Sequence, residues 1–184
     1  MEKVLRLWKK AGQTPLDVID ALRQEKPEYI DQKITYAGRL DPLAEGEMIL
    51  LVGEEVHNKQ QYLDLEKEYE VDILLGVSTD SFDTLGLVLE EGVVSAKWFE
   101  KTEKYIEKHI GEFEQKYPPF SSKTVDGKPM FQLTKDKVEF EIPTHKVKMV
   151  SAEILEDKII SKEELIKLIQ EKNSVIKGDF RQVE

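Results

Sequence analysis

Cysteine is absent from the 184-residue chain, which excludes disulfide scaffolds, cysteine-ligated zinc, iron–sulfur clusters and thiol catalysis. The three histidines, His57, His109 and His145, form no H-x-x-x-H pair, so a zinc hydrolase is not expected. No apolar run approaches the length of a membrane-spanning helix, and the first residues lack the apolar core of a signal peptide. These absences predict a cytoplasmic protein with no metal site and no membrane contact.

Acidic residues outnumber basic ones by 37 to 27, and the net charge of −10 argues weakly against a nucleic-acid partner. The acidity is uneven, because residues 40–117 carry −12 whereas residues 1–39 and 118–150 each carry +2. The chain is 40% apolar, shows no repeat or low-complexity linker, and has the length of one ordinary domain. We therefore expect a single domain over residues 1–184.

Apolar runs, caps and turn residues predict a mixed α+β fold rather than a parallel βαβ array. Extended segments are expected at Val4–Trp8, Lys33–Tyr36, Met48–Val52, Glu68–Leu75, Leu87–Glu90 and Val147–Leu155. Helices are expected from a Thr14–Asp17 cap to about Gln24, at Glu54–Leu63, at Ser95–Ile110, and from a Ser161–Glu164 capping box to about Glu171. A polar loop is expected at Val77–Leu85. Its acidic part, Thr79–Asp83, lacks calcium-loop spacing and is expected to cap neighbouring backbone.

The most informative segment carries Asp41 and Pro42 between two glycines, Gly38 and Gly46, directly before the apolar run Met48–Val52. An Asp-Pro pair is most often a turn, in which the carboxylate bonds local backbone. The flanking glycines allow close approach of a ligand, and a rigid strand after a loop is typical of catalytic positions. Turn chemistry alone leaves both interpretations open, and it does not separate a nucleophilic aspartate from a binding one.

The motif Gly38-Arg39-Leu40-Asp41-Pro42-x-Ala44-x-Gly46 resembles the catalytic motif of the TruB-type pseudouridine synthases. Four further blocks are similar to that family's motifs in the same order: Trp8–Val18, Lys67–Gly86, Pro118–Lys128 and Lys177–Arg181. The departures are a tyrosine, Tyr36, at the family's histidine position and a loop after Pro118 that is one residue shorter. The chain also ends at Glu184, where the family continues, often into an RNA-binding PUA domain. We expect either a minimal member or a shortened chain.

The resemblance implies a pseudouridine synthase fold, with a mixed, mostly antiparallel sheet flanked by helices and a catalytic cleft across it. It implies that Asp41 attacks C6 of the uracil or C1′ of its ribose, that Tyr69 lies against the flipped-out base, and that Arg181 pairs with Asp41. The uracil then rejoins its ribose through C5, a reaction that needs no cofactor. The competing interpretations are a half-buried strand aromatic for Tyr69 and a solvated terminal side chain for Arg181.

Substrate contacts are expected from three parts of the chain that the resemblance assigns to RNA, with a binding loop at about residues 117–140. The candidates are Lys9, Lys10, Tyr36, Gly38, Arg39, Pro119, Ser121, Lys123 and Lys128. Because the protein carries −10 overall, we expect the basic residues of this set to converge around the Asp41 loop. The alternative for the loop is a proline-rich surface turn with ordinary solvated lysines.

The function that these residues predict is the isomerisation of uridine to pseudouridine at position 55, in the T loop of tRNA, by a monomer. One alternative is a pseudouridine synthase of the RsuA or RluA type acting on ribosomal or other RNA, because Gly38-Arg39-Leu40-Asp41 is also similar to the RsuA-type motif. Another is a catalytically silent RNA-binding protein. The presence of Asp41 argues against the latter, since binding alone does not require an aspartate there.

Overall fold

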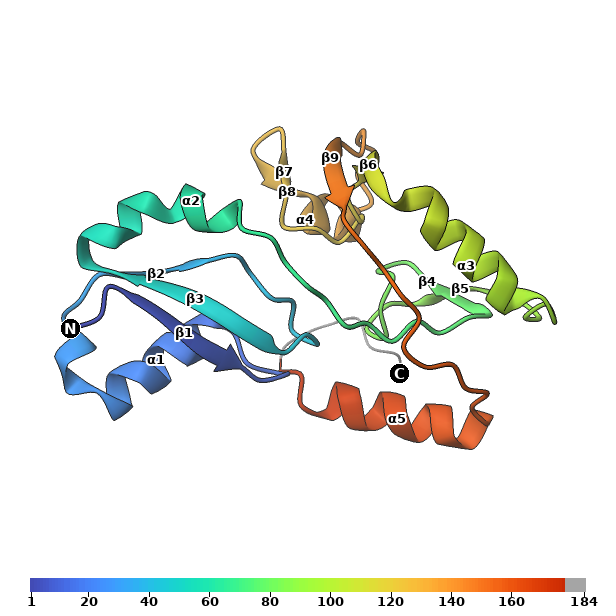
Figure 1. The fold of residues 1–184 in the computed structure, drawn as a ribbon, viewed down its shortest axis with the longest axis horizontal. Helices are drawn as coiled ribbons and strands as arrows, with labels where there is room; N and C mark the ends of the chain where they lie inside the picture. The colour runs from blue at the N-terminus through green and yellow to red at the C-terminus, as the bar shows by residue number, and fades with distance from the viewer. Residues whose placement is uncertain (178–184) are drawn as a thin grey trace. The chain divides into compact units, whose positions relative to one another are not determined.

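The computed structural model describes residues 1–177, which divide into two compact units. Unit 1 contains residues 1–71 and 162–177, and unit 2 contains residues 72–161. Figure 1 shows the helices and strands of both units.

The centre of unit 1 is a three-stranded antiparallel sheet in the order β1-β3-β2. Its strands are β1 (Val4–Lys9), β2 (Ile34–Ala37) and β3 (Gly46–Val52). β1 and β3 pair from Val4 opposite Leu51 to Lys9 opposite Gly46. Exposed and buried side chains alternate along β1, as expected for a strand with one face on a core.

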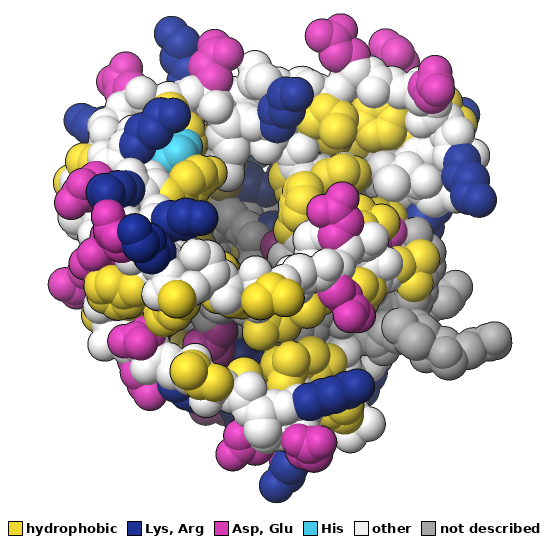
Figure 2. Space-filling model, turned by 90° about the vertical axis from the view of Figure 1, so that its right-hand side faces the viewer, with side chains coloured by type: hydrophobic (Ala, Val, Ile, Leu, Met, Phe, Trp, Pro, Cys, Tyr) yellow, Lys and Arg dark blue, Asp and Glu magenta, His cyan; other side chains and the backbone are white. Residues whose placement is uncertain are grey.

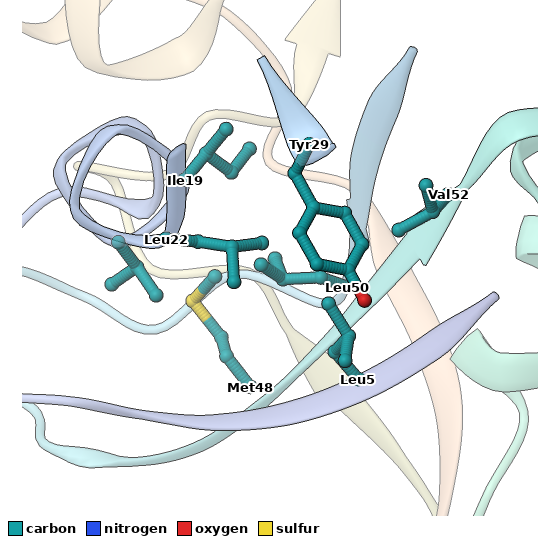
Figure 3. Packing of buried hydrophobic residues seen from close by; sticks show 8 residues of the cluster. Leu5, Ile19, Leu22, Tyr29, Met48, Leu50 and Val52 are labelled. Carbon is teal, nitrogen blue, oxygen red and sulfur yellow. The ribbon is translucent and has the colours of Figure 1, made fainter. Parts of the chain in front are cut away.

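Helix α1 (Pro15–Glu25) covers one face of this sheet and supplies much of the core. It starts with a complete capping box, in which the Thr14 hydroxyl accepts from the Asp17 N–H and the Asp17 carboxylate accepts from the Thr14 N–H. Figure 3 shows the packing between helix and sheet, with Tyr29 from the 3₁₀ helix η1 (Pro27–Tyr29) closing one side. The buried cluster comprises Leu5, Val18, Ile19, Leu22, Tyr29, Met48, Leu50 and Val52.

Three further elements complete unit 1. The 3₁₀ helix η2 (Gly53–Asn58) leads into α2 (Lys59–Leu63), which contacts β2. Helix α5 (Lys162–Ser174) returns to the unit from the far end of the chain.

Unit 2 contains three two-stranded antiparallel sheets and two helices. The sheets pair β4 (Val77–Thr79) with β5 (Val88–Glu91), β6 (Gly111–Lys116) with β9 (Thr144–Met149), and β7 (Thr124–Val125) with β8 (Lys128–Pro129). The helices are α3 (Trp98–His109) and α4 (Met130–Lys135). Met130 and Leu133 of α4 are buried, which fixes this helix in the unit.

Large hydrophobic side chains remain exposed in both units, and Figure 2 shows several on one face, interspersed with charged ones. In unit 2 they include Ile73, Leu89 and Val93. Within residues 1–177, no helix is both long and apolar enough to cross a membrane.

The α+β class and most of the expected helices and strands are confirmed, but three expected segments differ. The strand expected at Glu68–Leu75 is wrong, because residues 66–74 carry no regular structure. The extended segment expected at Val147–Leu155 stops at Met149, where its pairing with β6 ends. The expected loop Val77–Leu85 instead begins with β4, because Val77 and Ser78 pair with Glu91 and Glu90.

Candidate active site

The loop that carries Asp41 connects β2 to β3 at one end of the unit 1 sheet. The chain leaves β2 through Gly38, whose φ of 86° is readily adopted only by glycine. Leu40 then packs against the hydrophobic core, so the residue before Asp41 is held by the body of the unit. The turn closes with the Ala44 N–H donating to the Asp41 carbonyl at 3.0 Å, around a proline at the position that favours such a turn.

Lys9, the last residue of β1, ties this loop to the sheet. Its side chain is fully buried, and its ammonium donates to the carbonyl oxygens of Ala44 at 2.7 Å and of Asp41 at 3.1 Å. A third bond, at 3.3 Å, goes to the carbonyl of Lys10. Three carbonyls satisfy the three donors of a lysine ammonium, so both ends of the Asp41–Ala44 turn are fixed to one buried charge.

The electrostatic environment of Lys9 has two opposing parts. Burial lowers the pKa of the Lys9 ammonium below its ordinary value, while the negative charges of Asp41 and Glu45 partly offset this effect. Desolvation is the larger contribution. A lysine kept in such a place at a desolvation cost, with all its donors on backbone, is an anchor for the loop rather than a surface cation.

A second contact holds the loop from the side of residues 10–13. The Gly12 N–H donates to the Pro42 carbonyl at 2.9 Å. Gly12 has a φ of 80°, and a Cβ at this position would lie 2.2 Å from the Val175 carbonyl oxygen. Only glycine therefore allows this turn to contact both the Asp41 loop and the chain that follows α5.

Asp41 itself lies exposed at the turn, with its backbone carbonyl fixed and its side chain open to solvent. Arg39 is also exposed, and within residues 1–177 the Asp41 carboxylate makes no ion pair. An accessible carboxylate on an immobilised backbone can act as a nucleophile or can stabilise a positive charge that develops in a bound substrate. Arg181, the expected partner, lies outside the described residues.

The two aromatic candidates of unit 1 differ in their surroundings. Tyr36, in β2, is half-buried against the core, and the Lys59 ammonium lies 5.2 Å from its ring centroid. Tyr69 is 68% exposed and lies in the segment without regular structure. The half-buried strand environment that was the alternative for Tyr69 is therefore absent from the structure.

The candidates from the expected RNA-binding loop belong to unit 2, where α4 fixes the loop. The Pro119 carbonyl accepts from the Thr134 hydroxyl at 2.8 Å, and the Ser121 carbonyl accepts from the Phe131 N–H at 3.0 Å. The Lys123 ammonium lies 5.5 Å from the centroid of the Tyr117 ring.

Lys128 begins β8, after a tight turn at Asp126-Gly127 in which both residues have positive φ. An Asp-Gly pair is a strong hairpin signal in a sequence. The expected capping role of the acidic loop is confirmed, because Asp80 accepts from the Leu87 N–H and Asp83 from the Leu85 N–H, each at 2.9 Å. In the described part of the chain no group of three or more His, Asp or Glu side chains could hold a metal ion.

Comparison with known sequences adds the decisive observation. Residues 26–173 match the profile described as TruB family pseudouridylate synthase, N-terminal domain. The chain belongs to the TruB family. The expected resemblance is thereby confirmed over most of the sequence.

Individual members of the TruB family are similar over most of this chain. The protein named tRNA pseudouridine synthase B from Caldanaerobacter subterraneus subsp. tengcongensis is 31% identical over 84% of the chain and 53% of its own length. The protein of the same name from Thermotoga maritima is 31% identical over 79% of the chain and 46% of its own length. The protein of the same name from Vibrio parahaemolyticus is 35% identical over 74% of the chain and 42% of its own length. The chain thus spans about half the length of the curated relatives it matches.

The role of Lys9 is the main feature that the sequence analysis missed. Lys9 was expected to contact RNA, whereas its ammonium binds the backbone of the Asp41 loop. The alternation of β1 contained the signal, since Leu5, Leu7 and Lys9 share the face that meets the core.

Proposed function

We propose that this protein is an RNA pseudouridine synthase that converts uridine to pseudouridine in the T loop of tRNA, at position 55. Membership of the TruB family and the similarity to proteins named tRNA pseudouridine synthase B support this proposal. The observation that carries it is the Asp41–Ala44 turn, which combines an exposed carboxylate with a backbone fixed by the buried Lys9 ammonium. A catalytic group requires both accessibility and a fixed position.

Asp41 is the catalytic carboxylate in this proposal. It attacks C6 of the uracil or C1′ of the ribose, and the bond between N1 and C1′ breaks. The detached uracil turns and a bond forms between C5 and C1′. The bond between Asp41 and the substrate breaks and restores the free carboxylate, C5 loses its proton and N1 gains one. Atoms and electrons balance without a cofactor, an oxidant or a nucleotide. The target base must leave its stack before Asp41 can reach it.

Tyr69 and Arg181 complete the proposed catalytic set. Tyr69 is exposed, so its ring is available to lie against an extruded uracil, with its hydroxyl near the C5 proton. Arg181 follows Lys177 by four residues, a separation that an extended chain spans in at most about 14 Å. Val175 contacts Gly12, which in turn bonds the Asp41 loop. A pairing of Arg181 with Asp41 is therefore compatible with the length of the chain between them.

RNA binding in this proposal involves the exposed Arg39 and Lys10 of unit 1 and the loop at about 117–140 in unit 2, with Lys123 and Lys128 contacting phosphates. Tyr36 and Gly38 shape the wall of the loop beside the bound base. Residues 1–184 act as one catalytic domain and as a monomer, with a substrate cleft across the sheet. Lys9 is assigned to the loop and not to RNA.

The test is release of tritium from [5-³H]uridine in three RNAs: a tRNA T stem-loop, the same stem-loop with cytidine at the target position, and a ribosomal RNA hairpin. The proposal predicts release and one pseudouridine in the first RNA, confirmed by mass spectrometry, and neither in the second. Release from the ribosomal hairpin alone would move the substrate to ribosomal RNA. Tight binding of the T stem-loop without release would indicate an RNA-binding protein and would overturn the catalytic assignment.

A further inference from the structure

The face of β1 opposite Lys9 carries an exposed tryptophan, which the site described above does not use. Trp8 is 61% exposed, although burying an aromatic side chain stabilises a protein. It stands opposite Glu47 in the sheet, one residue before the loop-anchoring Lys9. Exposed aromatics of this kind are enriched at binding surfaces rather than on bare protein surface.

Cationic side chains flank Trp8 on the same face. Arg6 and Trp8 occupy successive exposed positions of β1, about 7 Å apart, and Lys10, which is also exposed, follows directly after the strand. We call Arg6, Trp8 and Lys10 the β1 strip. Its spacing is comparable with that of successive phosphates in an extended nucleic-acid strand.

The local charge favours a polyanion. The first ten residues carry a net side-chain charge of +3 in a protein of −10. Arg6 contacts Glu47 at 3.3 Å, but both side chains are more than half exposed. Such a surface pair contributes little free energy, so the Arg6 guanidinium can exchange the carboxylate for a phosphate.

We infer that the β1 strip binds the unpaired nucleotides next to the target uridine, with one base stacked on Trp8 and the flanking phosphates on Arg6 and Lys10. This inference rests on the proposed function. Aromatic rings flanked by cations are the usual means of binding single-stranded nucleic acid. The strip also lies beside the site, because the Lys9 ammonium, between Trp8 and Lys10 in sequence, bonds the Asp41 carbonyl at 3.1 Å.

The chain offers a direct optical test, because Trp8 and Trp98 are its only tryptophans. In Asp41→Asn/Trp98→Phe protein the fluorescence reports Trp8 alone, and the substitution of Asp41 prevents turnover. Titration with a T stem-loop RNA should quench this emission saturably, with the same Kd as a filter-binding assay. In Asp41→Asn/Trp8→Phe protein, which reports Trp98, the emission should not change. Binding without quenching of Trp8 would overturn the inference.

Affinity supplies a second readout. Trp8→Ala should weaken binding of the T stem-loop at least about fivefold, while Trp8→Phe retains most of the affinity, because stacking contributes about 1–3 kcal/mol per base. Leu16→Ala is the matched control, since Leu16 is 64% exposed on α1 and such surface changes alter affinity by no more than about twofold. Arg6→Gln and Lys10→Gln should each reduce the slope of log K against log salt by about 0.7.

The outcomes separate this inference from the proposed function. Wild-type pseudouridine formation combined with unchanged affinity of Trp8→Ala would overturn the β1 strip alone and would point to a protein partner for Trp8. Absence of pseudouridine formation, with Trp8 quenched by RNA, would overturn the catalytic proposal and leave the strip standing. Circular dichroism melting of each variant confirms that a change in affinity does not come from unfolding.

Discussion

Replacing Lys9 with methionine removes the ammonium from the Asp41 loop while keeping a long, flexible side chain in the buried site. The three carbonyls of Ala44, Asp41 and Lys10 lose their donor. A hydrogen bond to a charged group contributes about 1.5–3 kcal/mol. Burying the ammonium costs several kcal/mol, and the pKa of Lys9 is lowered because burial disfavours the charged form. We therefore expect the free energy of unfolding to fall by only about 1–3 kcal/mol.

The expected effect on catalysis is larger than the effect on stability. Loss of the anchor leaves the Asp41–Ala44 turn without its contact to β1, and a displacement of about 1 Å in a catalytic group costs about 100-fold in rate. Single-turnover release of tritium should therefore slow by about this factor in Lys9→Met protein. RNA affinity and its salt dependence should not change, because the Lys9 side chain is fully buried.

Lys10→Met is the matched control, since Lys10 is exposed and adjacent in sequence. It should reduce the salt slope of RNA binding by about 0.7 and keep the rate at saturating RNA. Urea titrations of both variants measure the change in the free energy of unfolding. The reasoning is refuted if Lys9→Met weakens binding and lowers the salt slope while the single-turnover rate stays at the wild-type value, because Lys9 would then contact RNA.

Three further predictions concern stability, each measured by urea unfolding. Burial lowers the pKa of Lys9 in the folded state, so the folded protein releases this proton at a lower pH than the unfolded chain does. The stability of wild type should therefore rise relative to that of Lys9→Met as the pH increases from the lowered pKa to 10.5. Parallel pH profiles of the two proteins would contradict this. Gly12→Ala places a Cβ 2.2 Å from the Val175 carbonyl at a φ of 80° and should cost about 2–4 kcal/mol. Gly53→Ala, with a positive φ but no neighbour within 4 Å, should cost only about 1–2 kcal/mol, and equal losses would refute the steric argument. Leu50→Ala in the fully buried centre of the core should cost about 2–5 kcal/mol, and a loss below 1 kcal/mol would show that the core is packed differently.

Local signals predicted the elements of unit 1 well. The Thr14–Asp17 cap, the apolar run before Val52 and the alternation of β1 each act over a few residues, and each element lies where those signals place it. The capping role of Asp80 and Asp83 was predictable for the same reason, because an aspartate bonds backbone close to it in sequence.

Features that depend on distant partners could not be predicted in this way. Glu68–Leu75 alternates polar and apolar residues as a strand would, but a strand also needs a neighbour, and none in residues 1–177 pairs with it. The anchoring role of Lys9 depends on carbonyls 32 and 35 residues away. The alternation of β1 places Lys9 on the face that meets the core, but the sequence does not show which carbonyls its ammonium binds there.

The measurement that tests the catalytic proposal most directly compares wild type with Asp41→Asn on a T stem-loop labelled with [5-³H]uridine. The amide has nearly the volume of the carboxylate and cannot act as a nucleophile, so the loss of transition-state stabilisation should exceed about 4 kcal/mol. We predict tritium release and pseudouridine formation by wild type, none by Asp41→Asn, and equal RNA affinity for the two proteins. Turnover by Asp41→Asn at the wild-type rate, with deamidation to aspartate excluded by mass spectrometry, would contradict the assignment of Asp41.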